Sequence, residues 1–316
     1  MSVLSRREML ALSAAAGTAL AFNPFELLAQ GKLNTKPIPS TGEQLPVIGL
    51  GSSATFAQVA RQEDVAALRD VLKTLVGAGA TLFDTAPSYG SSEEVAARIA
   101  VDGGLGDKLF WATKLNVAGR SGSADPAAAR QQVETSFTRI KKAKIDLIQV
   151  HNMGDPPAQL KILRDYKDKG RVRYIGITTT FENQYADLIA TMKSEPLDFI
   201  GVDYAIDNRE VENVILPLAR EKKIAVLCYA PFGRTRLFKR VGNNPVPEWA
   251  SEFDAKTWAQ FFLKFAVSHP AITAATPATS QAKNMLDNIG GGIGRMPNEA
   301  MRKRMIDYVD KLPSAG

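Results

Sequence analysis

Short apolar runs and amphipathic helical periods alternate along most of the chain. Each run is hydrophobic almost throughout, without the polar residue at every second position that a half-exposed strand shows. Strands of a parallel sheet that is covered by helices have this character. The eight runs are residues 48–51, 81–85, 109–113, 145–151, 172–178, 197–204, 224–230 and 272–276.

Helical patterns fill the intervals between these runs. Asp125 followed by Pro126 provides an N-cap and a first-turn proline for a helix that we expect to run to about Lys142. One set of apolar residues is spaced by 3, 4, 7 and 8 positions, which places them on a single helix face. That set is Val211, Val214, Ile215, Leu218 and Ala219. Eight strands that are each followed by a helix predict a (β/α)8 TIM barrel, an α/β fold.

Two further elements flank the predicted barrel. A short hairpin precedes it, with residues 37–40 turning at 41–43 and returning through 45–48. After the last strand, Met301, Met305, Val309 and Leu312 form an apolar stripe with helical spacing. We therefore expect an extra C-terminal helix over residues 297–312, packed against the barrel wall.

A doubly wound parallel sheet is the alternative fold. That fold needs a glycine-rich turn directly after its first strand, and residues 49–54 lack the third glycine and the following helix of a dinucleotide-binding fingerprint. The total length of 316 residues suits one large domain, since single α/β barrels reach 200 to 250 residues. We predict a single barrel domain over residues 31–316.

The first thirty residues differ from the rest of the chain. Ser5, Arg6 and Arg7 precede Met9 and Leu10, and an uncharged, alanine-rich segment follows as far as Phe22. This is the pattern of a twin-arginine signal, and the segment is too short and too rich in alanine and glycine for a stable membrane span. We expect export through the twin-arginine machinery to the periplasm, with residues 1–30 as the signal segment and the cleavage site left open.

Charge and cysteine content narrow the chemistry. The formal net charge is +6, but lysine and arginine are interspersed with acidic residues, so the dense basic stripe of a nucleic-acid-binding protein is missing from the sequence. Cys228 is the only cysteine, and His151 and His269 are the only histidines. This count excludes an intramolecular disulfide and a thiolate zinc cluster, and we predict no metal site.

Polar residues gather at the ends of three predicted strands. The second strand ends in Asp84 and is followed closely by Tyr89, the third is followed by Lys114, and the fourth ends at His151. In a TIM barrel the carboxyl ends of the strands carry the chemistry. These four side chains are therefore expected to converge on one mouth of the barrel.

The chain resembles the aldo/keto reductase family. Four motifs carry the resemblance in the order that the family shows, and together they span nearly the whole chain from about Lys36. They are Phe83-Asp84-Thr85-Ala86-Pro87-Ser88-Tyr89-Gly90, Thr113-Lys114, Gln149-Val150-His151-Asn152 and Tyr229-Ala230-Pro231-Phe232-Gly233-Arg234. The resemblance implies this barrel, NADPH as the usual cofactor and reversible reduction of a small-molecule carbonyl compound.

The matched catalytic tetrad is Asp84, Tyr89, Lys114 and His151, and its chemistry is physically reasonable. Hydride addition to a carbonyl leaves an oxygen that needs a proton, and a phenol with an ordinary pKa near 10 is a reluctant acid unless a cation lies beside it. Lys114 suits that role, and Asp84 would keep the ammonium charged. His151 would orient the carbonyl oxygen. Taken singly, Asp84 and Lys114 could be an ordinary interior ion pair and His151 a core histidine.

The resemblance also implies a set of cofactor-binding residues. Gly51, Ser52 and Ser53 would lie beside the nicotinamide ribose, and Tyr229 would stack on the nicotinamide ring. The residues implied for the pyrophosphate are Ala230, Pro231, Phe232, Gly233 and Arg234. Thr178 and Thr179 stand where the family commonly has Ser-Asn at the carboxamide, and Gly201 replaces its usual glutamine. Water is one way to replace the lost amide.

The adenosine phosphate would lie on the last unit. The residues implied there are Thr279, Ser280, Lys283, Asn284 and Asn288. Many relatives have a lysine and an arginine where this chain has Ala278 and Asn284, so Lys283 is the one nearby cation in the sequence for a 2′-phosphate. We expect NADPH as the cofactor, with NADH as the alternative.

The remaining expectations concern side-chain packing, the pocket and the alternative function. Trp111 and Cys228 alternate with inward-facing residues, so they should pack outward under the helices. The long connection over residues 233–254 could close over cofactor and substrate, and Phe56 and Trp249 are candidates for an apolar pocket lining. The alternative function is a nicotinamide-binding sensing or regulatory protein with little turnover.

Overall fold

The computed structural model describes residues 31–62, 65–118 and 122–312, so the predicted signal segment and the domain boundary after residue 30 lie outside the described residues. Eight parallel strands form one sheet in the order β10-β9-β8-β7-β6-β5-β4-β3. Parallel bridges from Ile48 to Ala275 and from Gly51 to Ala278 join its two edges. The strands are β3 (Leu50–Gly51), β4 (Leu82–Asp84), β5 (Phe110–Leu115), β6 (Ile145–Val150), β7 (Val172–Thr179), β8 (Phe199–Asp203), β9 (Ala225–Tyr229) and β10 (Ala274–Ala275).

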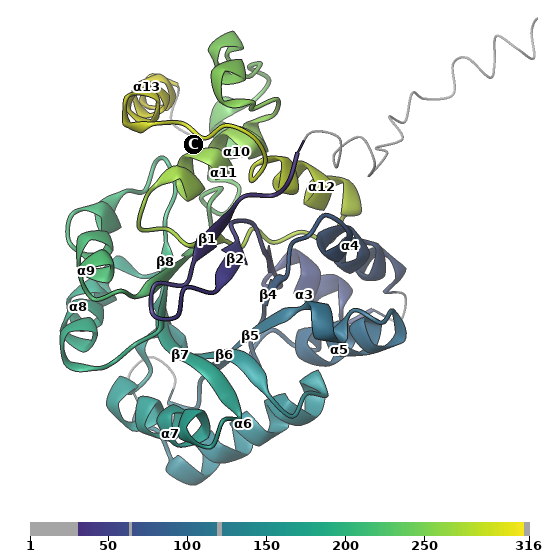
Figure 1. Cartoon of the computed structure of the whole chain (residues 1–316), viewed down its shortest axis with the longest axis vertical. Helices are drawn as coiled ribbons and strands as arrows, with labels where there is room; N and C mark the ends of the chain where they lie inside the picture. The colour runs from purple at the N-terminus through teal and green to yellow at the C-terminus, as the bar shows by residue number, and fades with distance from the viewer. Residues whose placement is uncertain (1–30, 63–64, 119–121, 313–316) are drawn as a thin grey trace, which may run out of the picture.

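Helices surround the sheet, as Figure 1 shows. The (β/α)8 TIM barrel is thus confirmed, and the doubly wound sheet is excluded because the strand order runs around the barrel without a reversal. The outer helices are α4 (Ala66–Gly77), α5 (Ser92–Asp102), α6 (Pro126–Ile140), α7 (Pro156–Asp168), α8 (Tyr185–Ser194), α9 (Ile215–Glu221), α11 (Trp258–Ser268) and α12 (Ala282–Gly290). Shorter or flanking helices are α3 (Thr55–Val59), α10 (Arg236–Val241) and α13 (Glu299–Asp310). Short 3-10 helices are η1 (Gly106–Lys108), η2 (His151–Met153), η3 (Glu182–Gln184), η4 (Glu210–Glu212) and η5 (Glu248–Phe253).

The helix boundaries follow from local chemistry. The Asp125 carboxylate accepts a hydrogen bond from the Ala128 amide at 2.8 Å, which confirms the predicted N-cap of α6, and Lys141 ends the helix in a left-handed conformation. In α13 the predicted stripe is confirmed by the burial of Met305 and Val309. The prediction that Val214 lies on the apolar helix face that begins at residue 211 is wrong. Because α9 begins at Ile215, Val214 lies before the helix and is 48% exposed.

The core has two layers that the strand alternation separates. One layer lies between the sheet and the helices. It contains Trp111 and the buried Cys228, as predicted. The Trp111 ring packs edge-on against Phe83, with 5.3 Å between the ring centres. Phe56 and Trp249 also belong to this layer. The second layer fills the barrel interior, and it includes the aromatic side chains of Phe110, Tyr174 and Phe199.

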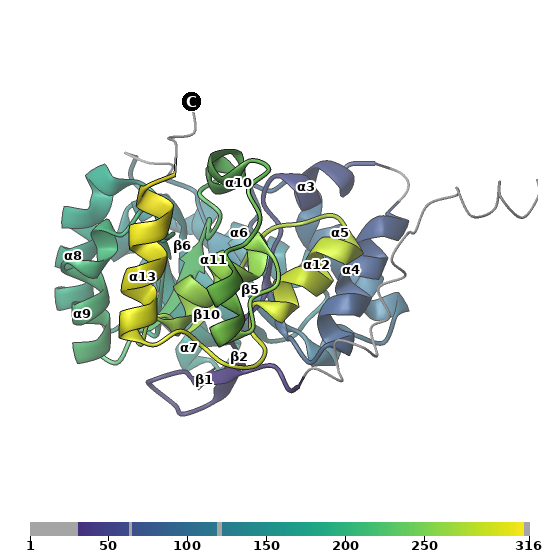
Figure 2. The ribbon, with the colours of Figure 1, turned by 90° about the horizontal axis from the view of Figure 1, so that it is seen from above.

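The predicted N-terminal hairpin closes the amino end of the barrel. It pairs β1 (Thr35–Pro37) with β2 (Gln44–Pro46), and Ile38 and Leu45 are buried against the interior layer. In Figure 2 the hairpin lies at the lower edge of the barrel, whereas α3 and α10 lie at the upper edge. The molecule therefore has one plugged end and one end formed by the loops that follow the strands.

No helix among the described residues is long and apolar enough to cross a membrane.

Candidate active site

A cavity of about 820 Å³ opens at the carboxyl ends of the strands. Its lining comes from the loops after β3, β4, β5, β6, β7, β9 and β10. All four residues of the predicted tetrad, Asp84, Tyr89, Lys114 and His151, belong to this lining. Residues that are far apart in the sequence are thus gathered at one mouth, the place where TIM-barrel chemistry occurs.

Asp84 and Lys114 form a buried ion pair at the floor of this cavity. The Lys114 ammonium lies 2.6 Å from Asp84 Oδ1 and donates a second hydrogen bond of 2.9 Å to the Thr85 carbonyl. Both side chains are at most 5% exposed. Asp84 ends β4 and is the register partner of Ala112 on β5, the adjacent strand. Lys114 follows Ala112 by two residues, on the same face of the sheet as Ala112, so its side chain can reach the Asp84 carboxylate.

The electrostatics of the pair depend on burial and on mutual attraction. Burial opposes the charged form of Lys114, but the charge of Asp84 and the neighbouring Tyr89 outweigh it, so the pKa of Lys114 lies above its ordinary value. Burial raises the pKa of Asp84, while Lys114 and a hydrogen bond from Tyr229 oppose that rise. Lys114 is therefore a fixed cation beside the cavity.

Tyr89 and His151 complete the constellation. The Lys114 ammonium lies 5.2 Å from the centre of the Tyr89 ring, and the Tyr89 and His151 rings meet edge to face at 5.8 Å. Tyr89 is partly exposed to the cavity, and His151 is buried. The geometry therefore places a phenol and an imidazole together beside one cation.

The backbone after β6 is bent to present His151. Asn152, Met153 and Asp155 have positive φ angles of 54°, 58° and 42°. The Asn152 amide donates to the Thr178 hydroxyl at 3.3 Å, and Gln184 donates to the Asn152 carbonyl at 3.1 Å. These bonds compensate for an unfavourable backbone, a combination that often marks functional positions.

Tyr229 reaches across the inside of the barrel. Its hydroxyl donates to Asp84 Oδ2 at 3.0 Å and accepts from Gln149 Nε2 at 3.0 Å. Its ring lies directly over Gly201, and it also contributes to the cavity lining. Burial, and then the charge of Asp84, raise the pKa of Tyr229 well above its ordinary value, so the phenol is a neutral donor. Stacking on a nicotinamide ring stays a prediction.

The predicted ribose and carboxamide residues are partly gathered at the same cavity. Gly51, Ser53 and Thr178 line it, and Ser52 is buried next to them. The Thr179 hydroxyl instead bonds to Gln184 at 2.6 Å, and Thr179 is not part of the lining. The pair is therefore divided: Thr178 lines the cavity, although its hydroxyl accepts from the Asn152 amide, whereas Thr179 does not line it.

The predicted pyrophosphate segment follows β9. Ala230, Pro231, Phe232 and Arg234 line the cavity, and Gly233 lies between them with a φ of +55°. Arg234 is 60% exposed at its side chain and lies 3.8 Å from Asp203. An exposed guanidinium with one distant partner is available to an anionic ligand.

Four of the predicted adenosine-phosphate residues lie around the start of α12, Asn288 lies near its end, and all five are outside the cavity lining. Lys283 and Asn284 are exposed, Ser280 is partly buried, and Thr279 and Asn288 are buried. The Thr279 hydroxyl accepts a hydrogen bond from the Gln281 amide at 3.1 Å, which shapes the turn into the helix. Only Lys283 among these five residues brings a charge.

The connection over residues 233–254 contains α10 and η5. Arg236 pairs with Asp207 at 2.7 Å, and Arg240 donates to the carbonyls of Asp310 and Leu312. Two basic side chains of this connection are thus already bonded within the protein. Phe56 and Trp249, proposed above for an apolar pocket lining, are absent from the cavity lining, because Phe56 packs on Phe83 and Trp249 packs on neighbouring rings of the outer core layer.

A model of the aldo/keto reductase family matches residues 47–303 of the chain. The chain belongs to the aldo/keto reductase family. The aldo-keto reductase YhdN of Bacillus subtilis (strain 168) is 30% identical over 207 residues, which are 62% of this chain and 61% of that protein. The chain thus matches only about three fifths of the length of this curated relative.

Solved aldo-keto reductases share the fold at lower identity. The holo form of AKR11C1 from Bacillus halodurans is 19% identical with a TM-score of 0.68, covering 88% of this chain and 96% of that chain. An aldo/keto reductase from Klebsiella pneumoniae in complex with NADP and acetate is 23% identical with a TM-score of 0.68, covering 85% and 93%. These likenesses support the barrel fold.

Several lining residues of this aldo/keto reductase had no predicted role. Ser88, Asn116, Asn152, Thr180 and Phe181 all contribute to the cavity. Each stands within a few residues of a strand end, so inspection of the complete loop after each strand would have found them. Gln149 was noticed only as part of a motif, and its contact with Tyr229 was missed because it joins strands that are not neighbours.

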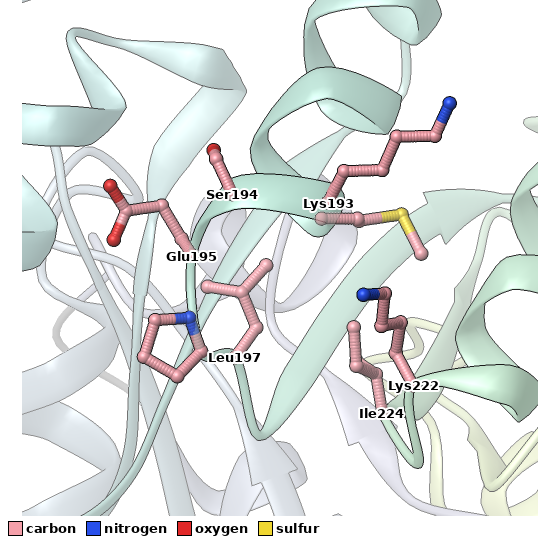
Figure 3. Close-up of a pocket in the computed structure, with 8 residues that line it drawn as sticks. Lys193, Ser194, Glu195, Leu197, Lys222 and Ile224 are labelled. Carbon is pink, nitrogen blue, oxygen red and sulfur yellow. The ribbon is translucent and has the colours of Figure 1, made fainter.

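A second hollow, of about 320 Å³, lies at the opposite end of the barrel, between the ends of α8 and α9 and the starts of β8 and β9 (Figure 3). Lys193 and Lys222 stand at its rim. Its acidic residue, Glu195, is paired with Arg164 at 2.5 Å. The hollow offers two solvated lysines and no tetrad residue, so the chemistry belongs to the larger cavity.

Proposed function

We propose that this aldo/keto reductase reduces an aldehyde or a ketone to an alcohol with NADPH, reversibly, with Tyr89 as the general acid and base. One observation carries the proposal: a buried Asp84–Lys114 ion pair holds its ammonium 5.2 Å from the Tyr89 ring, at the floor of a cavity that also contains His151. A fixed cation beside a phenol is what proton transfer by tyrosine requires.

The residues at the mouth fit a nicotinamide nucleotide. Ser52 and Thr276 have buried hydroxyl oxygens that lack a hydrogen-bond partner among the described residues, and Thr276 lines the cavity. Such hydroxyls suit the ribose and the carboxamide of a nucleotide. Arg234 would bind the pyrophosphate, and Lys283 would bind a 2′-phosphate. NADH is the alternative cofactor, because Lys283 is the one cation among the predicted adenosine-phosphate residues. The NADP complex of the Klebsiella relative supports the choice of NADPH.

When bound, NADPH supplies the hydride. The rest of the chemistry belongs to side chains of this protein. Tyr89 gives its hydroxyl proton to the oxygen of the carbonyl group and takes a proton in the reverse direction. Lys114 stabilises the phenolate that remains, Asp84 keeps Lys114 charged, and His151 donates a hydrogen bond that orients the oxygen.

The Tyr89→Phe variant tests this assignment. Because only the proton donor is lost, carbonyl reduction should fall by a factor on the order of 10² or more, while the affinity for NADPH, measured by fluorescence titration, should stay the same. Tyr308→Phe removes a hydroxyl from a tyrosine that packs on Trp249 in the outer layer, and it should leave both values unchanged. Unaltered turnover in Tyr89→Phe would contradict the assignment.

A multiple-turnover assay with generic aldehydes addresses the alternative. A sensing or regulatory protein would bind the nucleotide without sustained oxidation of NADPH, whereas the enzyme would consume it in proportion to the aldehyde. The intact tetrad favours the enzyme.

We also propose that the enzyme is exported to the periplasm by the twin-arginine machinery, with its nucleotide bound. The support is the pattern around Arg6 and Arg7. NADPH is formed in the cytoplasm, and a ligand that binds only the folded protein also stabilises it during transport. The double variant Arg6→Lys, Arg7→Lys should stay folded, bind nucleotide and remain in the cytoplasm.

Cell fractionation checks this second proposal. Wild-type protein should appear in the periplasm and release NADP or NADPH on denaturation, as identified by mass spectrometry. Wild-type protein that is found only in the cytoplasm would overturn the export, and exported protein that is empty and cannot retain added NADPH would overturn the link between loading and export.

A further inference from the structure

We propose that Tyr229 is a positioning residue for the catalytic ion pair: its hydroxyl, held over Gly201 by Gln149, fixes the Asp84 carboxylate in the orientation that serves Lys114. The inference rests on the proposed function only in so far as Asp84 and Lys114 act in catalysis. Its geometric content concerns the protein alone and can be tested without turnover.

The hydrogen bonds divide the carboxylate between two partners. Oδ1 of Asp84 faces the Lys114 ammonium at 2.6 Å, and Oδ2 accepts from the Tyr229 hydroxyl at 3.0 Å. That hydroxyl accepts in turn from Gln149 Nε2 at 3.0 Å, and Gln149 is fully buried. The amide therefore directs the single phenol proton toward Asp84, because the other side of the oxygen is already occupied by a donor.

The contact between Tyr229 and Asp84 depends on a glycine, Gly201, on β8, the strand next to that of Tyr229. A Cβ atom at position 201 would lie 2.2 Å from Tyr229 Cε2 and 2.8 Å from the Tyr229 oxygen, far inside van der Waals contact. Gly201 on β8 and Leu227 on β9 are register partners, and Tyr229 follows two residues later on the same inward face. Gly201 and Tyr229 are thus a complementary pair, and a side chain at 201 would exclude the ring from this position.

A buried carboxylate needs this kind of support. Desolvation penalises its charged form, and an oxygen without a partner would either take up a proton or rotate. The charged and titratable groups around Asp84 are Lys114 on β5, Tyr229 on β9 and, beyond Lys114, Tyr89 after β4. Among them, the Tyr229 hydroxyl is the donor that reaches Oδ2. Its loss should favour protonation of Asp84.

The Tyr229→Phe variant keeps the ring and removes the donor. Since the lost hydrogen bond is one to a charged group, kcat should fall on the order of tenfold. The acidic limb of the kcat profile should move to higher pH, because Asp84 must be ionised to hold Lys114. Fluorescence titration should show an unchanged affinity for NADPH.

Tyr204→Phe is the matched control. Tyr204 lies one residue beyond β8 in the outer core layer, and its buried hydroxyl also donates to a carboxylate, that of Glu212. This variant should lower thermal stability without moving the acidic limb. A Tyr229→Phe enzyme with the wild-type kcat and acidic limb would overturn the proposal.

Crystal structures of the protein without nucleotide supply the readout that does not depend on activity. In Tyr229→Phe and in Gly201→Ala, which should displace the ring, we expect Asp84 to rotate or its Oδ2 to gain a water molecule. An Asp84 that keeps the same orientation and the same contacts with Lys114 in both variants would overturn the proposal, whether or not the wild type reduces carbonyl compounds. Absence of turnover by the wild type, with Asp84 displaced in both variants, would instead contradict the proposed function alone.

Discussion

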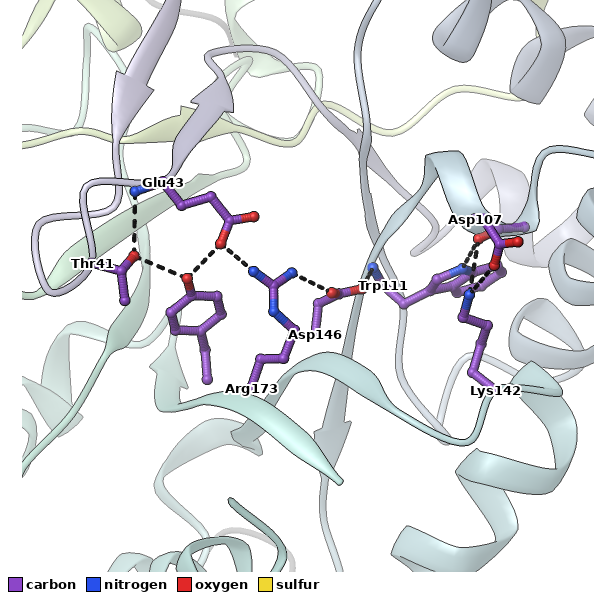
Figure 4. Close-up of polar contacts among 9 residues, drawn as sticks. Thr41, Glu43, Asp107, Trp111, Lys142, Asp146 and Arg173 are labelled. Atoms are coloured by element: carbon purple, nitrogen blue, oxygen red, sulfur yellow. Dashed lines mark hydrogen bonds and ion pairs between the residues drawn. The ribbon is translucent and has the colours of Figure 1, made fainter. Parts of the chain in front are cut away.

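The two ends of the barrel differ in how far their buried polar groups are paired within the protein. At the amino end, Arg173 bridges two carboxylates, those of Glu43 in the hairpin and of Asp146 on β6 (Figure 4). Asp146 Oδ2 also accepts from the Trp111 amide at 2.8 Å, and Tyr174 donates to Glu43 at 2.5 Å. Every charged group of this network has a partner.

At the carboxyl end, several buried oxygens lack a partner within the described part of the chain. They belong to Ser52, Thr85, Asn116, Gln149, Asp203 and Thr276. Backbone strain collects at the same end, where seven residues other than glycine have positive φ angles. These residues are Ala54, Asn152, Met153, Asp155, Ala230, Arg234 and Thr235.

This difference between the two ends indicates that the amino end contributes mainly to stability and the carboxyl end mainly to function. Buried polar groups without partners and strained backbone cost free energy of folding, and natural proteins retain them where a ligand or a reaction needs them. At the hairpin end, by contrast, the charged groups of the Arg173 network are all paired with one another. Variants at the carboxyl end should therefore change activity more than stability, and variants at the amino end should do the reverse.

The largest effect is expected for Lys114→Met. Loss of the cation beside Tyr89 should reduce carbonyl reduction at least 10²-fold or shift the alkaline limb of the rate profile. Lys264→Met is the control, since Lys264 is also buried but donates to the backbone carbonyls of Ile293 and Arg295 rather than to a carboxylate. It should destabilise the protein and leave the pH profile of the folded enzyme intact. If rate and profile both survive in Lys114→Met, this lysine is merely structural.

The sequence allowed the architecture and the tetrad to be predicted because both depend on short-range patterns. Near-continuous apolar runs identified every barrel strand, and the residues at the carboxyl ends of three of them, Asp84, Lys114 and His151, lie together in the structure. The contact of Tyr229 with Asp84 could not be predicted in this way. It spans 145 positions and depends on the empty space above Gly201, which only the closed barrel defines.

The protein should lose stability when the Arg173 bridge at the amino end of the barrel is removed. Arg173→Met leaves Glu43 and Asp146 without their shared cation, and because the three side chains are 16–34% exposed we expect a loss of about 1–3 kcal/mol in the free energy of unfolding. Denaturant titration measures this loss, and kcat should stay within about twofold because the network is remote from the cavity. Arg130→Met, which breaks a more exposed pair with Asp165, should cost less stability than Arg173→Met. Equal losses in the two variants would contradict the expectation.

His269 should make stability depend on pH. Burial, and then the positive charges of Arg302, Lys36 and Arg220, lower the pKa of His269 from 6.5 to about 4. Between these two values the unfolded chain binds a proton that the folded chain does not, so stability falls as the pH falls from 6.5 to 4. Because His269 is partly exposed, we expect this contribution to be only about 1–2 kcal/mol after screening by solvent.

His269→Asn isolates that contribution, because its side-chain oxygen can still accept the hydrogen bond that the Ala271 amide donates to His269 Nδ1. Denaturant titrations at pH 7 and pH 4.5 should show a smaller loss of stability for the variant than for the wild type. The same loss in both proteins would show that other groups carry the pH dependence.

The smallest effects are expected for two threonine substitutions, of which only one should lower the stability of the protein. At the carboxyl end, Thr276→Val removes a buried hydroxyl that has no hydrogen-bond partner in the described part of the chain. The free energy of unfolding should therefore stay equal or rise by about 0.5 kcal/mol, while the affinity for NADPH falls several-fold. At the amino end, the Thr41 hydroxyl bonds to Tyr174 at 2.9 Å and accepts from the Glu43 amide at 3.3 Å. Thr41→Val should therefore lower stability by about 0.5–1.5 kcal/mol and leave nucleotide affinity unchanged. Denaturant and fluorescence titrations of both variants measure the two quantities side by side. A loss of stability of the same size in both would mean that the unpartnered hydroxyl is not reserved for a ligand, and the contrast between the two ends would fail at its most direct test.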